Sequence, residues 1–202
     1  MKDTYKTIES NSEEVLFKDK NSKFFGYAFP ITSEDEIKLN IENLKKQHHS
    51  ARHWCYAWQI GTEFITYRAN DDGEPNNSAG MPIYGQIQSF DVTNVLVVVV
   101  RYFGGVKLGV SGLINAYRTG AKMALEESKI IERTIDHYYL LKFNYNKLNI
   151  VMRMIKENQL PIVSQEMELT CSIKISVRKK DSERIFELFN SIFEVDITSL
   201  ND

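Results

Sequence analysis

Residues 93–125 read TNVLVVVVRYFGGVKLGVSGLINAYRTGAKMAL, and their pattern decides the fold of the first half of the chain. The run from Asn94 to Val100 is almost entirely apolar and β-branched, which predicts a strand buried on both faces. The chain is expected to turn at residues 101–105 and to enter a helix near Ser111. One side of that helix consists of small residues that would let it approach a sheet closely: Ala116, Gly120, Ala121 and Ala124.

Strand and helix signals also alternate upstream of this segment. Residues 23–29 (KFFGYAF) predict a strand, and Ser33 followed by Glu36 forms the capping-box pattern that opens a helix. Residues 53–60 (HWCYAWQI) alternate between large aromatic and smaller side chains, as expected for a strand with two different faces. A hairpin partner is expected at residues 63–69. These elements form a first domain at residues 1–132.

The remainder of the chain, residues 133–202, predicts a second domain with the element order β-α-β-β-α-β. This order is that of the ferredoxin-like arrangement. The fold class is therefore α+β with two domains. The expected elements lie at residues 137–145, 146–158, 160–169, 170–177, 181–192 and 193–198.

Composition restricts the class of protein. A chain of 202 residues favours two modest domains, and it contains no run of about 18 apolar residues that could span a membrane. The N-terminus lacks the apolar core of a signal peptide, and two distant cysteines suit a reducing compartment, so a soluble cytoplasmic protein is expected. A net charge of −2, with no basic excess in either half, disfavours a basic nucleic-acid-binding domain but leaves a local basic patch open.

Residues 68–80 (RANDDGEPNNSAG) predict a loop that concentrates acidic side chains. Asp71, Asp72 and Glu74 could cap backbone N–H groups, contact a partner, or hold a hard cation such as Mg²⁺. The spacing of these carboxylates does not fit an EF-hand. Structural capping is the favoured interpretation, and Ser78 is expected to cap a short helix at residues 79–89.

Residues 101–112 (RYFGGVKLGVSG) follow the buried strand and lead into the helix. Glycines there would let backbone N–H groups approach an anion at the start of the helix, with positive charge from Arg101 and Lys107. Tyr102 and Phe103 could stack on a base or on a partner side chain. The segment is neither a Walker loop nor GxGxxG. An equally supported alternative is that the glycines serve tight packing and that Tyr102 and Phe103 fill the core.

The remaining candidates for chemistry are histidine and cysteine residues. His53 and Cys55 share one strand face, so a Cys–His nucleophile is conceivable, but a packed Cys55 is favoured because free cysteine is usually buried. Cys171 is expected in the core of the second domain. The sequence contains no Ser-His-Asp arrangement or HExxH motif, and we expect no cofactor and no resident metal.

Four segments together resemble the IMPACT/YigZ family: residues 21–31, 53–58, 68–83 and 93–125. The resemblance covers the whole first domain, and the second domain resembles the C-terminal half of the bacterial two-domain members. It implies a first domain similar to domain IV of elongation factor G and a second similar to the ferredoxin-like domain V of the same factor. Asn77 and Ser111 stand where the family pattern usually has glycine.

The resemblance also implies a function. Eukaryotic IMPACT proteins, which are similar to this chain in the first domain, limit the activation of a starvation-responsive kinase that acts on a translation initiation factor. A binding or regulatory protein linked to translation is therefore favoured over an enzyme, with the ribosome, RNA or a translation-related protein as the partner. The residues expected to form the binding surface are Arg68, Asp71, Asp72, Glu74, Arg101, Tyr102, Phe103, Gly104, Gly105, Lys107 and Gly109.

Two other hypotheses stay open at the level of sequence. One is an enzyme that acts on a nucleotide or a phosphorylated small molecule, with Mg²⁺ held by Asp72 and Glu74. It requires that these carboxylates face the glycine-rich segment across a cleft. The other is a purely structural role, in which the motifs stabilise an unusual fold.

Overall fold

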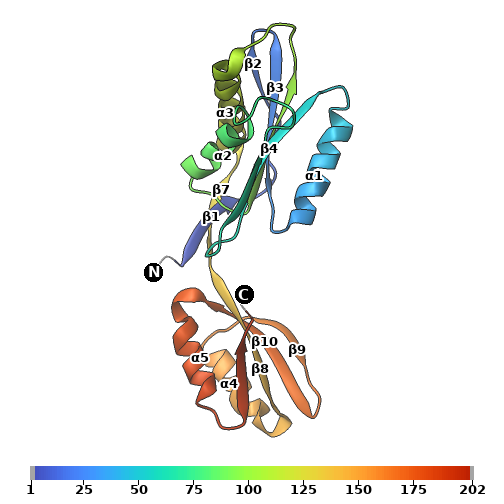
Figure 1. Ribbon diagram of the computed structural model, residues 1–202. Helices are drawn as coiled ribbons and strands as arrows, with labels where there is room; N and C mark the ends of the chain where they lie inside the picture. The colour runs from blue at the N-terminus through green and yellow to red at the C-terminus, as the bar shows by residue number, and fades with distance from the viewer. Residues whose placement is uncertain (1–2, 201–202) are drawn as a thin grey trace. The chain divides into compact units, whose positions relative to one another are not determined.

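The computed structural model describes residues 3–200 and shows a mixed α/β chain that divides into two compact units (Figure 1). The first unit comprises residues 5–133. The second comprises residues 134–200 together with Asp3 and Thr4. The first unit has a hydrophobic core on each face of its sheet, and the second unit has one core of its own.

An antiparallel sheet in the order β2-β3-β6-β4-β5 forms the centre of the first unit. Its strands are β2 (Val15–Asp19), β3 (Ser22–Pro30), β4 (His53–Ile60), β5 (Thr66–Asn70) and β6 (Val95–Tyr102). The predicted apolar strand is β6, which lies in the middle of the sheet and is buried from Val95 to Arg101. It continues two residues beyond its predicted end, because Arg101 and Tyr102 pair with β3 instead of turning.

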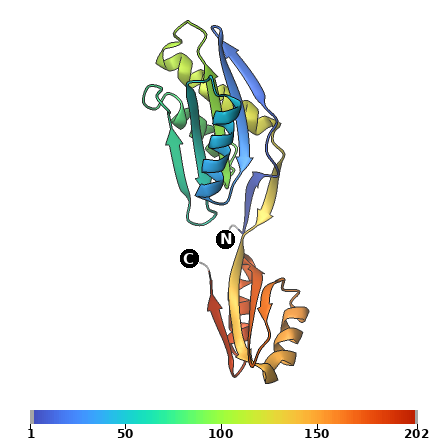
Figure 2. The same cartoon turned by 90° about the vertical axis from the view of Figure 1, so that its right-hand side faces the viewer.

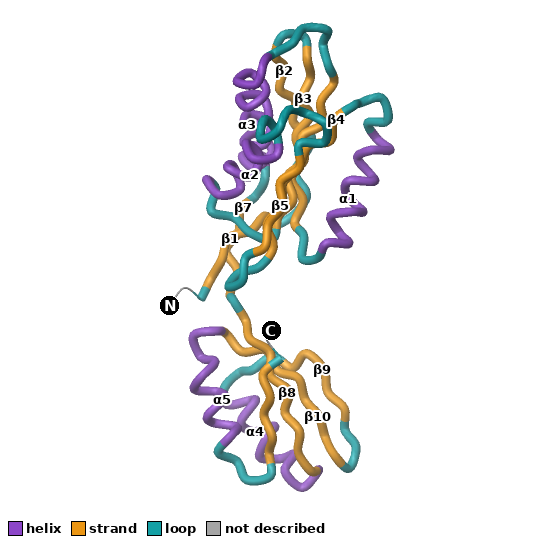
Figure 3. The backbone as a smooth tube through the Cα atoms, in the orientation of Figure 1, coloured by secondary structure: helices purple, strands orange, loops and turns teal. Residues whose placement is uncertain are grey.

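Helices cover both faces of this sheet (Figure 3). Helix α1 (Glu34–Gln47) packs on one face, and α2 (Gly80–Ser89) and α3 (Gly109–Glu127) pack on the other. The capping box that opens α1 is confirmed, since the Ser33 side chain accepts from Glu36 N–H and the Glu36 side chain accepts from Ser33 N–H. The predicted alternation of β4 is confirmed as well, because its aromatic face and its small face contribute to different cores.

The small-residue side of α3 lets the helix lie very close to β3. A Cβ atom added to Gly26 would lie only 2.5 Å from the carbonyl oxygen of Gly120. No real Cβ makes so short a contact, so both the strand and the helix depend on the absence of a side chain at Gly26. The expectation that small residues permit close packing is confirmed.

Three short strands were not predicted. Strand β1 (Thr4–Ile8) pairs with β7 (Ile130–Thr134) in a separate two-stranded sheet. Both are five residues long and include charged side chains, so neither gives a clear apolar pattern. Strand β2 was missed for the same reason.

The second unit contains the six predicted elements in the predicted order along the chain, with both helices on one face of the sheet (Figure 2). Its antiparallel sheet has the order β11-β8-β10-β9. The elements are β8 (Asp136–Asn144), α4 (Leu148–Glu157), β9 (Ile162–Glu166), β10 (Thr170–Arg178), α5 (Ser182–Asn190) and β11 (Val195–Ser199), with single 3₁₀ turns η1 (Tyr145–Lys147) and η2 (Lys179–Asp181) before the two helices.

Two expectations from composition can be compared with the structure. Within residues 3–200, every helix is too short or too polar to cross a membrane. Cys55 and Cys171 are both free thiols and both are buried, the first in the core of the first unit and the second in the core of the second unit. The prediction that Cys171 is a core residue is therefore confirmed.

Candidate functional site

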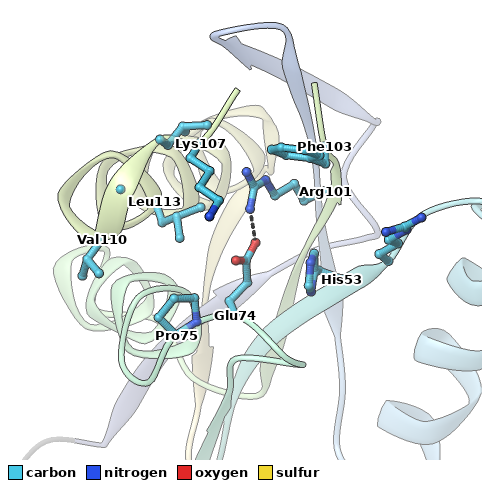
Figure 4. A pocket seen from close by; sticks show the side chains of 11 residues that line it. His53, Glu74, Pro75, Arg101, Phe103, Lys107, Val110 and Leu113 are labelled. Carbon is cyan, nitrogen blue, oxygen red and sulfur yellow. Dashed lines mark hydrogen bonds and ion pairs between the residues drawn. The ribbon is translucent and has the colours of Figure 1, made fainter. Parts of the chain in front are cut away.

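A pocket of about 430 Å³ lies between two loops of the first unit (Figure 4). We call residues 71–79, which join β5 to α2, the acidic loop, and residues 103–108, which join β6 to α3, the glycine loop. Both loops contribute to the pocket, together with the start of α3 and the start of β4. The lining residues are Arg52, His53, Glu74, Pro75, Arg101, Phe103, Lys107, Leu108, Gly109, Val110 and Leu113.

Asp71 uses its whole carboxylate inside the acidic loop. Its Oδ1 accepts hydrogen bonds from the N–H groups of Ala79 (2.9 Å) and Gly80 (2.8 Å), and its Oδ2 accepts from the N–H of Asn77 at 2.9 Å. It thereby satisfies donors at the start of α2. The prediction that Ser78 caps this helix is wrong, because its hydroxyl donates to the carbonyl of Pro75 at 2.6 Å.

Asp72 is also held by hydrogen bonds inside the protein. Its Oδ2 accepts from the N–H of Trp54 at 2.7 Å, and its carbonyl accepts from His53 Nδ1 at 2.9 Å. The loop closes with Asn77 at a φ of +61°, a conformation that asparagine adopts more readily than most residues. The absence of the family's usual glycine at this position is therefore accommodated. The capping interpretation holds for both aspartates.

Glu74 is buried, with its carboxylate beside Arg101 and Tyr117. It forms an ion pair with Arg101, with 2.6 Å between Oε1 and Nη1, and the same oxygen accepts from the Tyr117 hydroxyl at 2.7 Å. Burial raises the pKa of Tyr117, which keeps this hydroxyl a donor. Only 8% of Glu74 and 5% of Arg101 are exposed to solvent. The pair therefore joins the acidic loop to the end of β6 inside the protein.

This arrangement corrects the expected role of Arg101. Sequence reasoning placed its charge on an exposed turn, free to meet an anion, but the side chain is buried and its charge is matched by Glu74. The guanidinium carbon lies 5.5 Å from the ring centroid of Phe24 on one side and 5.5 Å from that of Phe103 on the other. Its Nε is buried and finds no hydrogen-bond acceptor among residues 3–200. A buried donor without a partner costs about 1–3 kcal/mol.

Tyr102 and Phe103 do not form one aromatic surface. The hydroxyl of Tyr102 lies 3.0 Å from His48 Nδ1, on the face of the sheet that α1 covers. Phe103 lies at the pocket and is 52% exposed. Arg68 is likewise separate from the pocket lining, because it is an exposed residue of the edge strand β5 and pairs with Trp58, which belongs to the α1-side core. Tyr102 and Arg68 are thus not brought together with the other predicted site residues.

The glycines in the glycine loop and at the start of α3 are needed for different structural reasons. A Cβ on Gly104 would lie 2.1 Å from the backbone carbon of Asn21, and the N–H of Gly104 donates to the Ser22 hydroxyl at 3.1 Å. Gly105 and Gly109 have open space around them but adopt φ values of +85° and +75°, which favour glycine. Gly109 is the first residue of α3, so the helix begins two residues before Ser111.

The mouth of the pocket is positively charged. Lys107 and Arg52 are exposed lining residues, whereas Glu74, the acidic residue that lines the pocket within the described chain, is already paired with Arg101. Helix α3 begins here without an acidic residue in its first turn and without a side-chain cap. Its free N–H groups add partial positive charge.

The Cys–His hypothesis is not supported by the geometry. The Cys55 thiol is fully buried and donates to the carbonyl of Asp71 at 2.9 Å, and burial raises its pKa. His53 donates to a backbone carbonyl instead of contacting the thiol. The expectation of a packed Cys55 is therefore confirmed. Within residues 3–200, no group of three or more His, Cys, Asp or Glu side chains is placed to hold a metal ion.

Sequence reasoning missed several residues of the site. Val110 and Leu113 form an apolar wall at the start of α3, and Arg52 adds a second exposed cation just before β4. The start of α3 gave a signal for the first two, since a helix that follows a glycine loop must present its first turn to that loop. Arg52 gave no local signal.

The fold and the site define a class of protein: a two-unit mixed α/β protein with a positively charged pocket between two loops of its first unit. The family model of the Impact N-terminal domain matches residues 20–125. The IMPACT family member YvyE of Bacillus subtilis is 30% identical over 191 residues, which cover 93% of this chain and 88% of YvyE. The chain belongs to the IMPACT family.

One solved structure shares the fold over the whole chain. A crystal structure of a hypothetical protein aligns over 100% of both chains with a TM-score of 0.76 and 23% identity. A second structure is described as the two-domain translational regulator Yih1. It is 25% identical and matches 59% of this chain and 46% of its own, with a TM-score of 0.37.

Proposed function

We propose that this chain is a cytoplasmic binding protein that acts in the regulation of translation, rather than an enzyme. Its contact surface is the mouth of the pocket, with Phe103, Lys107, Arg52 and Val110 as the contact residues. The partner is the ribosome, RNA or a translation-related protein. The observation that carries the proposal is the exposure of an aromatic ring and two cations beside acidic groups that are all engaged inside the protein.

The state of the acidic loop supports binding over metal-assisted catalysis. The enzyme hypothesis needs Asp72 and Glu74 to face the glycine loop together. Glu74 does so, but it is paired with Arg101, and the Asp72 carboxylate accepts from the backbone of Trp54. The resemblance to eukaryotic IMPACT regulators supplies the link to translation, because the first domain carries that resemblance.

We also propose the finer fold assignments. The first domain, residues 1–132, is related to domain IV of elongation factor G, and the second, residues 133–202, is ferredoxin-like. The sheet order β11-β8-β10-β9 supports the second assignment, because it places the two central strands of a βαββαβ chain as that arrangement requires.

The test is co-sedimentation of the protein with ribosomes of its host at low and moderate salt. We expect salt-sensitive binding, since displaced counterions weaken association as salt rises. Lys107→Gln should weaken binding roughly tenfold, a change of about 1.4 kcal/mol. The matched control is Lys122→Gln, which removes an exposed lysine from α3 outside the pocket lining. Equal binding of the two variants, or no binding at either salt concentration, would contradict the proposal.

A further inference from the structure

The charges of the pocket favour a ligand with a compact negative group. Lys107 and Arg101 reach toward the same space from the glycine loop and from β6 (Figure 4). Arg52 adds a third cation to the lining, and Glu74 offsets one of the three charges. A net excess of two positive charges, in a space partly shielded from water, matches a phosphate monoester better than a single carboxylate.

Helix α3 directs backbone donors at the same space. It is 19 residues long, and its first residues, Gly109 and Val110, line the pocket. Its first turn has neither an acidic residue nor a side-chain cap. The N-terminus of a helix binds phosphate through such free N–H groups and through the positive end of the helix dipole.

Arg101 gives an observation that is independent of the helix. Its side chain is buried, lines the pocket, and leaves Nε without an acceptor among residues 3–200. The ion pair with Glu74 uses Nη1, so it leaves Nε without a partner in the described part of the chain. A bound ligand that carries acceptor oxygens would satisfy this donor.

The walls of the pocket are suited to a flat apolar body. Phe103 is half exposed, and Val110, Leu113 and Pro75 form the opposite side. Exposed aromatic rings bind nucleic-acid bases by stacking. A volume of about 430 Å³ lies at the small end of the range for ligand pockets, which suits one nucleotide.

We propose that this pocket binds a single nucleotide. Its phosphate lies between Lys107 and the N-terminus of α3, and its base stacks on Phe103. The nucleotide is either a free molecule or the phosphorylated end of an RNA strand, since both present the same group. This inference rests on the proposed function, because it names the chemical group that the same surface recognises.

The test is isothermal titration calorimetry of the full chain at low salt with four probes: adenosine monophosphate, adenosine, inorganic phosphate, and a short single-stranded oligoadenylate with a 5′-phosphate. Adenosine should bind at least tenfold more weakly than adenosine monophosphate. Lys107→Gln should weaken binding of the monophosphate at least tenfold, and the matched variant Lys122→Gln should leave it unchanged. Phe103→Leu should weaken binding of the monophosphate while leaving that of inorganic phosphate unchanged.

Equal affinity for adenosine and its monophosphate would overturn the inference, as would equal effects of the two lysine variants. Absence of binding by both the monophosphate and the oligonucleotide would overturn it too. Tighter binding of the oligonucleotide would identify an RNA end as the source, and equal binding would identify the free nucleotide. If ribosome co-sedimentation persists while no nucleotide binds, the inference fails and the proposed function stands. If a nucleotide binds but ribosomes do not, the inference stands and the proposed function fails.

Discussion

The acidic loop and the glycine loop border the same pocket, but they use their polar residues in opposite ways. In the acidic loop, Asp71 and Asp72 accept backbone hydrogen bonds and Glu74 is buried in an ion pair. In the glycine loop, Phe103 and Lys107 are exposed. The composition of a loop therefore does not reveal whether its charged groups are available to a partner. Their burial and their hydrogen-bond partners do.

The largest effect is expected when the ion pair between the acidic loop and β6 is broken. Glu74→Leu should lower the free energy of unfolding by about 3–5 kcal/mol, because it leaves the buried Arg101 charge without a partner. Urea denaturation would measure the change. The double variant Glu74→Leu/Arg101→Met should lose less than the sum of the single variants. A loss under about 1 kcal/mol for the single variant would show that the pair is not a structural tie.

Removal of the carboxylate that organises the acidic loop should have the next largest effect. Asp71→Ala leaves three backbone N–H groups without their acceptor, and we expect a loss of about 2 kcal/mol in urea denaturation. Asp71→Asn keeps one carbonyl oxygen and should recover part of that loss. Unchanged stability of the alanine variant would mean that water replaces the carboxylate.

Within the glycine loop, Gly104 is needed for the fold because the backbone passes very close to Asn21. Gly104→Ala should cost about 2 kcal/mol, because the new methyl group would collide with the backbone at Asn21. Gly105→Ala meets no neighbour and should cost only about 1 kcal/mol, from its positive φ. Thermal unfolding of the two variants would compare them. The reverse order of stability would contradict the close approach at Gly104.

On the face of the sheet that carries Tyr102, we expect a smaller, pH-dependent effect on the free energy of unfolding. His48 is buried beside Tyr27, Tyr102 and Glu14, and burial lowers the pKa of the imidazole, although the Glu14 charge partly opposes this. The unfolded chain therefore binds a proton more readily than the folded chain.

The contribution of His48 to stability should be complete above pH about 6.5, the ordinary pKa of histidine, and should be lost as pH falls through the lowered folded pKa. Urea denaturation between pH 7 and pH 5 should show a steeper loss for the wild type than for His48→Gln. Parallel pH profiles would exclude His48 as the responsible group.

The smallest effect on stability is expected at the exposed lysine of the glycine loop. Lys107→Gln should change the free energy of unfolding by less than about 0.5 kcal/mol, because the side chain is exposed. A chemical denaturation curve suffices to check this. A change above about 1 kcal/mol would place Lys107 with the structural residues of the acidic loop and would remove the contrast between the two loops.

Much of the fold could be predicted from local patterns. The β-branched run identified β6, the Ser33–Glu36 spacing identified the start of α1, and the alternation of β4 identified its two faces. Strands β1 and β7 could not be found in this way. Each is only five residues long and includes a charged side chain, so neither shows an alternation of apolar and polar residues.

The site was harder to predict, because its key contacts join residues far apart in the sequence. Arg101 and Glu74 are 27 positions apart, so no local pattern reveals that they neutralise one another. Asp71 caps α2 from eight positions before Ala79, beyond the span of the usual capping motifs. The separation of Tyr102 from Phe103 was available to sequence reasoning, since neighbouring residues at the end of a strand point to opposite faces.

Hydrogen-exchange mass spectrometry of the protein, alone and with ribosomes of its host, tests most directly whether the glycine loop is the contact surface and the acidic loop its support. We predict slower exchange on binding at residues 103–113 and unchanged exchange at residues 71–79. Slower exchange at residues 71–79 without any change at residues 103–113 would contradict the assignment of binding to the glycine loop.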